Sequence, residues 1–405
     1  MLKAKSKQYT FIDIFAGCGG LSEGFYKQGF KSLTHVEIDP YACKTLRTRM
    51  MHYGYKKVEI SVLETDLNRK DIIEIINNEL KGQTVDVIIG GPPCQSFSSL
   101  GRAKDEKGMV DDPRNFLFER YVEILNHFEP KFFVFENVTG LLSAKVNGIP
   151  IVQKILNELG KKYRLLDDPY KMVLNSCDYG VPQIRKRVIL IGVRKDLNIQ
   201  PLEIYKEIIK THSNPENDKD LNKGLNRFVT VKDAISDLPS IKPGEGFPLV
   251  KHKIKTSNDF LLKILDMKNN LLRDHVARTH NFQDRLRYKT MSKNKWTYSE
   301  LLKRKPELNH IKQRVFNNSY TVQWWDLPSK TIIAHLYKDG NQFIHPDHKQ
   351  ERTITPREAA RLQSFPDNFV FEGSKTQQYK QIGNAVPPLL AEAIAKSLKK
   401  VLKNV

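Results

Sequence analysis

Cys94 has the sequence setting of a nucleophile. It follows an apolar run, two glycines and two prolines in VDVIIGGPPCQSFS at 85–98. A lone cysteine is most often a buried, inert side chain. Here, however, the prolines stiffen a polar turn and hold the thiol just after a predicted strand. Because even a small thiolate fraction is strongly nucleophilic, this cysteine suits conjugate addition to an electrophilic carbon.

Four further polar residues border apolar runs. Glu136 ends a predicted strand in KFFVFENVTGL. A partly desolvated glutamate can donate a proton near neutral pH, although a helix-capping acid is about as frequent. Gln183, Arg185 and Arg187 alternate in CDYGVPQIRKRVILIG, so they should face one side on entry to a strand. Two arginines on one face suit a phosphate or a base carbonyl, and a solvated strand end is the alternative.

A glycine-rich turn follows the first apolar run. DIFAGCGGLSEGF begins at residue 13 and predicts a strand, a turn and a helix that begins near Leu21. Gly17, Gly19 and Gly20 let the backbone approach a ligand and present its amide groups. Their spacing differs from the GxGxxG dinucleotide fingerprint, which disfavours a nicotinamide cofactor. On its own, the turn is as compatible with no ligand as with one.

Two acids strengthen the argument for a ligand. Glu37 ends the second predicted strand, in HVEIDP, and Asp66 ends the third, in ETDLN. A carboxylate at the end of the second strand can accept hydrogen bonds from ribose hydroxyls, and the other acid could accept one from an adenine amino group. Either acid alone is more often a solvated side chain or a helix cap. Together with the glycine turn, they favour an adenosine-type ligand.

The elements that must position these residues alternate in type. Strands are predicted at 11–15, 33–38, 58–66, 85–90, 131–136 and 187–193, with a weaker one in YRLLDD and helical spacing at 117–125 and 151–159. Such alternation predicts an α/β fold, a doubly wound and mostly parallel sheet with helices on both faces. Ligands bind such sheets outside the carboxyl ends of the strands.

Regular patterns stop after Lys195 and return at Thr355. TPRE predicts a capping box and a helix that ends before Pro366. A last helical pattern from Pro388 should pack back onto the N-terminal sheet. We therefore expect one domain of 1–195 plus 375–405, a connecting segment at 351–374, and a smaller, irregular domain at 196–350.

The charge balance points to a polyanionic partner. The 405 residues carry a net charge of +20, which is typical of proteins that bind nucleic acid. The segment 251–320 holds 17 Lys and Arg against 6 Asp and Glu, a net charge of +11. No apolar run is long enough to cross a bilayer, and no secretory signal is recognisable. The four cysteines form no CxxC pair, so we expect a reduced, intracellular protein without a metal site or disulfide framework.

The motifs occur in the order found in one enzyme family. FAGCGGLSEGF, EIDP, GGPPCQSFS, ENVTGL, QIRKR, RTITPREAARLQSFPDNF and QIGNAVPP resemble those of DNA cytosine-5 methyltransferases of the bacterial and phage restriction-modification type. The resemblance covers roughly 11–195 and 352–398. It implies a Rossmann-like fold that binds S-adenosyl-L-methionine as methyl donor, and a target cytosine flipped out of duplex DNA.

The resemblance also implies a role for each catalytic residue. Cys94 would add to carbon 6 of cytosine, which makes carbon 5 enamine-like. Glu136 would hold and protonate N3. Arg187 would contact the base carbonyl, while Arg185 would support the loop and a phosphate.

The cofactor positions follow from the same matches. They are Phe15, Gly17, Gly19, Gly20, Leu21, Glu37, Ile38, Asp66, Leu67, Pro93, Asn384 and Val386. Ile38 departs from the aromatic residue that some members place under the adenine, so apolar packing would replace that contact. Asn384 and Val386 precede the final helix, and the C-terminal segment would thereby complete the pocket.

The resemblance assigns DNA contacts to two regions. Residues 95–115, with Gln95, Ser96 and Arg102, match the mobile loop that closes over DNA in the family. The domain at 196–350 corresponds to the target-recognition region, whose Lys and Arg excess suits phosphate contact. SKTIIAHLYKDG resembles the Thr-containing element near its end, so Thr331, together with Gln183, is expected near DNA.

Other functions remain open on the sequence. A tRNA cytosine-5 methyltransferase would have a similar architecture, but such enzymes tend to have a smaller recognition region. A non-catalytic nucleic-acid-binding protein on the same scaffold would not need Cys94, Glu136, Arg185 and Arg187 intact. A compact length is typical of a cytoplasmic bacterial or phage enzyme. A separately encoded restriction endonuclease would be a compatible partner, and no membrane partner is expected.

Overall fold

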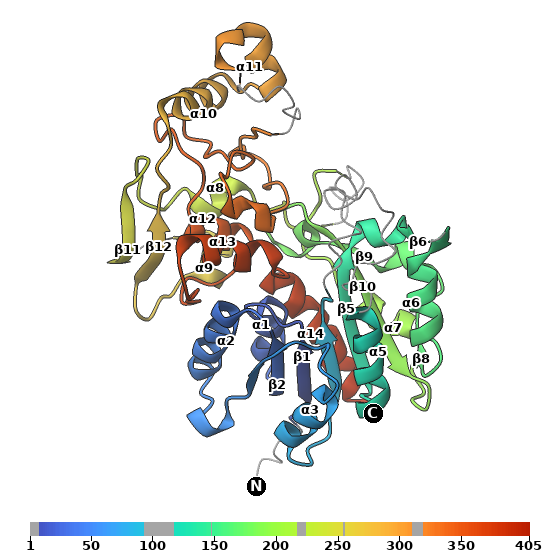
Figure 1. The fold of residues 1–405 in the computed structure, drawn as a ribbon. Helices are drawn as coiled ribbons and strands as arrows, with labels where there is room; N and C mark the ends of the chain where they lie inside the picture. The colour runs from blue at the N-terminus through green and yellow to red at the C-terminus, as the bar shows by residue number, and fades with distance from the viewer. Residues whose placement is uncertain (1–7, 93–116, 147, 217–223, 254–255, 310–318) are drawn as a thin grey trace. The chain divides into compact units, whose positions relative to one another are not determined.

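The computed structural model describes residues 8–92, 117–146, 148–216, 224–253, 256–309 and 319–405. It forms two compact units (Figure 1). Unit 1 comprises Met1–Asn175, Lys186–Ile209 and Pro388–Val405, and unit 2 comprises Ser176–Arg185 and Lys210–Pro387. Residues 351–387 therefore belong to unit 2, whereas the sequence suggested a connecting segment at 351–374 and a return to the first domain at 375.

Unit 1 is built on one twisted sheet. Its strand order is β3-β2-β1-β4-β5-β10-β8, and β9 also pairs with β10. The strands are β1 (Thr10–Ile14), β2 (Lys31–Glu37), β3 (Val62–Glu64), β4 (Val87–Gly90), β5 (Phe132–Val138), β8 (Tyr163–Arg164), β9 (Val173–Asn175) and β10 (Lys186–Arg194). The first five are parallel, and β10 is antiparallel to β5, β8 and β9. The predicted mostly parallel sheet is confirmed.

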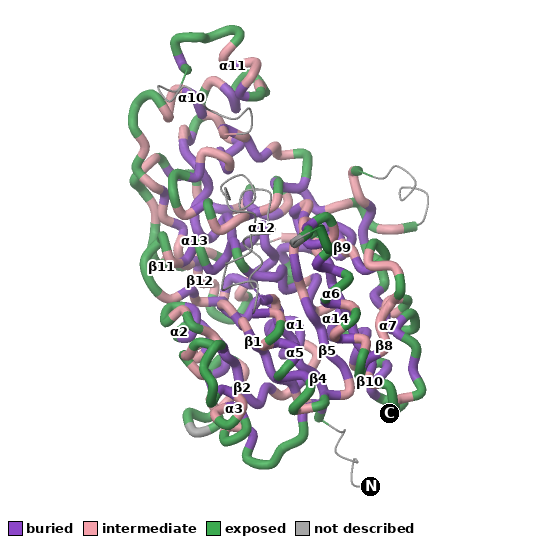
Figure 2. Tube along the Cα trace, turned by 45° about the vertical axis from the view of Figure 1, so that its right-hand side comes forward, coloured by how far each residue is buried: buried purple, intermediate pink, exposed green. Residues whose placement is uncertain are grey.

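Helices cover both faces of this sheet. They are α1 (Gly20–Lys27), α2 (Pro40–His52), α3 (Ile72–Leu80), α5 (Leu117–Phe128), α6 (Ile151–Leu159), α7 (Pro201–Glu207) and α14 (Pro388–Leu402), and a short hairpin adds β6 (Lys145–Val146) and β7 (Ile149–Pro150). On one face, Ile12, Ile14 and Ile88 pack with α3, α5 and α6 in one apolar cluster. On the other, the Phe11 ring lies 5.3 Å from that of Phe25 in α1. Successive strand residues are thus buried on opposite faces of the sheet. Figure 2 shows that the central strands of unit 1 consist mainly of buried residues.

Two predicted strands differ in extent from the observed ones. The third covers Val62–Glu64 rather than 58–66, because Lys57–Glu59 form a 3₁₀ turn whose start is capped by Glu59, which accepts from the Lys56 N–H. The fifth continues to Val138, because the antiparallel partner β10 pairs with it along its whole length. Glu136 therefore lies inside a strand and not at its end.

Unit 2 has little regular structure and a strongly ionic interior. It contains α8 (Val231–Ile235), α9 (Asp259–Ile264), α10 (Phe282–Asn294), α11 (Tyr298–Arg304), α12 (Pro356–Leu362), α13 (Lys375–Asn384) and the antiparallel pair β11 (Gly246–Lys251) and β12 (Leu271–Val276). In α12, the predicted capping box is present, since Thr355 accepts from Glu358 N–H and Glu358 accepts from Thr355 N–H. Burial alone would raise the pKa of Glu358, but Arg352 and His345 hold it below its usual range.

The last helix of unit 1, α14, packs closely on α1, whereas the sequence predicted only that it would pack back onto the N-terminal sheet. Gly24 of α1 lies against the backbone of α14, and a Cβ added there would be 2.2 Å from the carbonyl carbon of Ala391. The Tyr9 hydroxyl donates to the Leu402 carbonyl, and the Ser397 hydroxyl donates to the carbonyl of Ile204. The C-terminal segment is therefore an integral layer of unit 1.

This contact predicts the effect of one methyl group. Gly24→Ala should lower the free energy of unfolding by roughly 1–3 kcal/mol, because the added methyl forces α1 and α14 apart. Thermal unfolding followed by circular dichroism measures the change. Gly82→Asn is the matched control, since Gly82 has open space around it and a positive φ that asparagine tolerates. Equal stability of the two variants would contradict close packing of these helices.

Candidate active site

The glycine turn follows β1 at the point where the strand order reverses, between β1 and β4. Parallel sheets bind ligands at such a switch point. Phe15, Gly17 and Gly19 all have positive φ, of 61°, 55° and 88°. A Cβ added at Gly17 would meet no atom within 4 Å. The turn therefore exposes backbone to open space at the carboxyl end of β1.

Glu37, the last residue of β2, holds this turn in place. Its Oε2 accepts from the Gly17 N–H at 2.8 Å, and its Oε1 accepts from the N–H groups of Ile38 and Asp39 at 2.9 and 2.8 Å. Burial raises the pKa of this carboxyl, and the three backbone donors oppose the rise. Because a carboxylate has about four acceptor positions, Glu37 keeps capacity for a ligand hydroxyl.

The remaining residues of unit 1 that were predicted to bind the cofactor lie on both sides of this turn. Asp66 is exposed two residues after β3, and its Oδ1 accepts from the Asn68 N–H. Ile38 is 64% exposed beside Glu37. Leu21 and Leu67 are buried, whereas Phe15 is partly buried and packs against the core. Gly20 is the first residue of α1. Since β2 and β3 are neighbours in the sheet, Glu37 and Asp66 share one edge.

Asp13 is a buried carboxyl that sequence reasoning missed. It is 1% exposed in β1, and the Ser22 hydroxyl of α1 donates to its Oδ2 at 2.5 Å. Burial raises its pKa from 3.8 to about 8, with the Ser22 hydrogen bond opposing and nearby Glu37 reinforcing the rise. Asp13 is therefore neutral at pH 7. An acid in the middle of the apolar run FIDIF was the signal that could have identified it.

The structure brings Glu136 and Arg187 together. Arg187 Nε lies 2.9 Å from Glu136 Oε1, and only 11% and 12% of the two side chains is exposed. Burial lowers the pKa of Arg187, and Glu136 opposes this effect. A Cβ added at Gly91 would be 2.8 Å from Glu136 Oε2, and the Asn137 amide donates to the Pro92 carbonyl. Glu136 thus lies against Gly91, and the adjacent Asn137 holds Pro92, the first residue of the PPCQ segment.

Gln183 and Arg185 form hydrogen bonds with other segments of unit 2, and their predicted DNA and phosphate contacts stay predictions. Both belong to unit 2, unlike Arg187, and both are buried. The Gln183 amide donates to the Leu362 carbonyl and accepts from Ile332 N–H. Arg185 Nη1 donates to the carbonyl oxygens of Ile332 and Gly383 at 2.6 and 3.3 Å. These side chains join separate segments of unit 2.

Three cysteines are poor nucleophiles. Cys18, Cys43 and Cys177 are buried thiols that form no disulfide. Burial raises the pKa of Cys43 to about 12 and raises the pKa values of Cys18 and Cys177 as well. Their thiolate fractions at neutral pH are therefore very small.

The other predicted site residues lie outside the described ranges or in unit 2. Pro93, Cys94, Gln95, Ser96 and Arg102 lie outside the described residues. In unit 2, Asn384 is the exposed last residue of α13, Val386 is buried, and the Thr331 hydroxyl donates to the Ile184 carbonyl. Within the described ranges, no cluster of His, Cys, Asp and Glu could hold a metal ion. No helix in that part of the chain is long and apolar enough to span a bilayer.

The raised pKa of Asp13 predicts a specific pH dependence of stability. The unfolded chain releases this proton near pH 3.8, whereas the folded chain retains it until about pH 8. The stability contributed by the protonated carboxyl is therefore complete below pH 3.8 and is lost as the pH rises towards 8. The side chain in Asp13→Asn cannot ionise. Between pH 5 and 8, the unfolding free energy of this variant should therefore fall less steeply than that of the wild type, with the two slopes differing by about 1 kcal/mol per pH unit.

Urea unfolding at a series of pH values measures this slope. Asp167→Asn changes an exposed acid of the same unit and should leave the slope unchanged. A wild-type slope in Asp13→Asn would show that Asp13 does not carry the retained proton.

Comparison with known proteins gives a consistent assignment. Residues 9–400 match the family model described as C-5 cytosine-specific DNA methylase. The chain is 35% identical to a Type II methyltransferase of Bacillus paralicheniformis, over 96% of this chain and 98% of the relative. It is 34% identical to another of Desulfomicrobium norvegicum, over 98% and 90%.

Solved structures agree with this assignment. A protein described as a DNA modification methyltransferase encoded within an E. coli prophage superposes with a TM-score of 0.71 at 28% identity, over 98% of this chain and 100% of that one. An Entamoeba histolytica methyltransferase, at 15% identity and a TM-score of 0.54, shares the fold. The sheet, the glycine turn and the Glu136–Arg187 pair thus occur in a chain that belongs to the C-5 cytosine-specific DNA methylase family.

Proposed function

We propose that the chain methylates carbon 5 of a flipped cytosine in a specific duplex sequence, through a covalent bond between Cys94 and carbon 6. The observation that carries this proposal is the buried contact between Glu136 and Arg187 beside Gly91, next to Asn137, whose amide donates to the Pro92 carbonyl. Cys94 follows Pro92 by two residues. The high pKa values of the three buried cysteines leave Cys94 as the nucleophile that best fits the chemistry.

The catalytic steps divide between these residues. Cys94 Sγ adds to carbon 6, and Glu136 donates a proton to N3, so that carbon 5 becomes nucleophilic. Arg187 donates to the base carbonyl and, through its contact with Glu136, fixes the orientation of the carboxyl group. After methylation, a base removes the proton from carbon 5 and the Sγ–carbon 6 bond breaks. Arg185 acts indirectly, by holding the segments of unit 2 that it joins.

S-adenosyl-L-methionine is the methyl donor that methyltransferases of this family and fold use, and it supplies an electrophilic methyl group when bound. The residues at the switch point fit such a group. Gly17 borders open space, and Glu37 keeps an acceptor position for a ribose hydroxyl. Ile38 offers an exposed apolar side chain for an adenine ring, and Asp66 an acceptor for its amino group. Phe15, Gly19, Gly20, Leu21, Leu67, Pro93, Asn384 and Val386 complete the proposed set.

The domain at 196–350, called the basic insert below, is proposed to bind the DNA duplex. Its charge of +11 over 251–320 suits phosphate contacts, and Gln95, Ser96, Arg102 and Thr331 are further proposed contacts. The curated relatives are Type II methyltransferases, which supports a role beside a separately encoded restriction endonuclease in the cytoplasm. Membership of a DNA methylase family over 9–400 favours DNA over the tRNA alternative.

Trapping with a modified base tests the covalent step. Duplex DNA with 5-fluorocytosine at the target should give a denaturation-resistant adduct with the wild-type chain in the presence of S-adenosyl-L-methionine. Fluorine cannot leave as a cation, so elimination stops and Cys94 stays bonded to the base. Cys94→Ala should form no adduct and show no methyl transfer, while its DNA affinity remains close to that of the wild type.

Peptide mapping identifies the bonded residue. Cys43→Ala is the matched control and should still form the adduct, since Cys43 is buried with a high pKa. An adduct mapped to Cys18, Cys43 or Cys177 would refute the assignment of Cys94.

Calorimetric titration tests the cofactor site without DNA. Glu37→Ala and Asp66→Ala should each weaken S-adenosyl-L-methionine binding by about 1–3 kcal/mol, the range for a lost hydrogen bond to a charged group. Glu64→Ala is the control, because Glu64 is the last residue of β3, at the same edge of the sheet, but pairs with Arg47. Wild-type affinity in both test variants would exclude the proposed site.

A further inference from the structure

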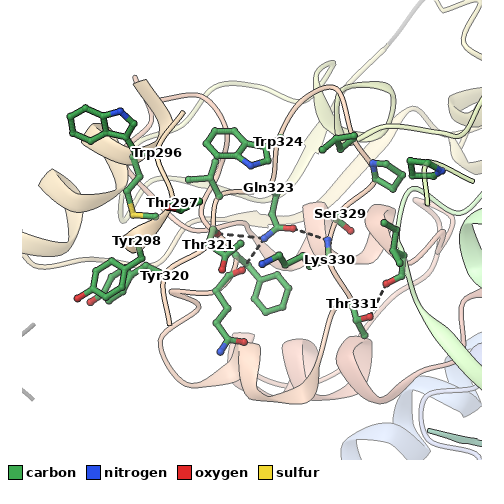
Figure 3. Close-up of a pocket in the computed structure, with 18 of the residues that line it drawn as sticks. Trp296, Thr297, Tyr298, Tyr320, Thr321, Gln323, Trp324, Ser329, Lys330 and Thr331 are labelled. Carbon is green, nitrogen blue, oxygen red and sulfur yellow. Dashed lines mark hydrogen bonds between the residues drawn. The ribbon is translucent and has the colours of Figure 1, made fainter. Parts of the chain in front are cut away.

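Unit 2 contains a cavity of about 860 Å³. One wall comes from the end of α10 and the start of α11, with Trp296 and Tyr298. The other comes from the segment 320–331, with Trp324 and Lys330 (Figure 3). A cavity of this size is in the range of ligand sites, and its lining combines aromatic rings with polar side chains that include Lys330 and Glu216.

The aromatic walls are closely packed. The Tyr298 and Tyr320 rings stack at 4.7 Å within an apolar cluster. Trp324 packs against this cluster and also lines the cavity. Its neighbour Trp325 instead makes an edge contact with the buried His345. Consecutive tryptophans thus have different surroundings, and Trp324 is the one available to a bound molecule.

The backbone around Lys330 is fixed on both sides. The Lys330 N–H donates to Gln323 Oε1 at 3.0 Å. Before it, the carbonyl of Ser329 accepts from Ile184 N–H at 2.9 Å. After it, the Thr331 hydroxyl donates to the carbonyl of Ile184 at 2.7 Å. Such pinning positions the base of the Lys330 side chain.

The Lys330 ammonium group itself is available. The residue is exposed, and within the described part of the chain no hydrogen bond or ion pair engages its Nζ. By contrast, the Gln323 side chain is 2% exposed and donates to the Gln342 carbonyl at 2.8 Å while accepting from Lys330. Of these two polar side chains, only Lys330 can form a new hydrogen bond with a molecule in the cavity.

We propose that Lys330 reads a guanine of the recognition sequence, with Trp324 as the apolar wall beside the contact. A lysine offers donors and no acceptor. In the major groove, guanine presents two adjacent acceptors, N7 and O6. Adenine has one acceptor, N7, beside an amino donor, thymine has one acceptor, O4, beside a methyl group, and cytosine presents an amino donor. Since guanine alone offers two acceptors side by side, a donor-only side chain favours guanine. This inference rests on the proposed role of the insert in binding duplex DNA, and it assigns to one residue a share of the sequence specificity.

Competition binding tests the proposal without requiring methyl transfer. Bisulfite sequencing of DNA treated with the wild-type chain first gives the recognition sequence. The full-length wild type, Lys330→Met and Lys330→Gln are then each bound to a duplex with the recognition sequence. Competitor duplexes, in which one base pair of that sequence at a time is replaced, measure how strongly each protein discriminates at that position. Lys330→Met should lose discrimination at one G·C pair by roughly 5- to 150-fold. Lys330→Gln should shift the preference there towards adenine, which suits an amide.

Lys380→Met removes the same charge from an exposed lysine of unit 2, in α13 and outside the segment 251–320, and should retain the wild-type preferences. Unchanged discrimination in Lys330→Met would overturn the proposal, as would an equal loss of affinity for every duplex, which indicates a phosphate contact. The catalytic proposal fails separately, since its criterion is the Cys94 adduct and not the sequence preference.

Discussion

The antiparallel pairing of β10 with β5 is the interaction on which the candidate active site depends. It sets Arg187 opposite Val138 and Ile189 opposite Glu136, so that an arginine and a glutamate far apart in sequence lie on neighbouring strands. The resulting ion pair is largely buried. A buried pair of this kind strongly penalises the removal of one partner, because the other is left as an uncompensated charge. The register of two strands thereby fixes the orientation of a carboxyl group.

The sequence predicted the sheet well because its signals were local. Apolar runs, the Thr355 capping box and the helical spacing after Pro388 each depend on residues close in the chain. The family resemblance added the order of the motifs. The extent of β5 was less predictable, since it depends on a partner strand about fifty residues later.

Alternation in QIRKR was a weaker guide to side-chain roles. It predicted one shared face for Gln183, Arg185 and Arg187, yet the chain passes from unit 2 to unit 1 between Arg185 and Lys186. Gln183 and Arg185 are held by carbonyl groups of residues 332–383, and nothing near them in the sequence indicates those partners. Asp13 was missed for a related reason, because its raised pKa arises from the surrounding layers of the fold.

The position of α14 has a consequence for biosynthesis. Its residues leave the ribosome only after the whole of unit 2 has been made. Until then, Gly24 and the rest of α1 have no helix to pack against, and one layer of unit 1 is missing. Unit 2 meets no such delay, since its last residues precede α14. Nascent chains can therefore complete unit 2 first, and a message truncated shortly before its end would yield a product that retains unit 2 but lacks the α14 layer of unit 1.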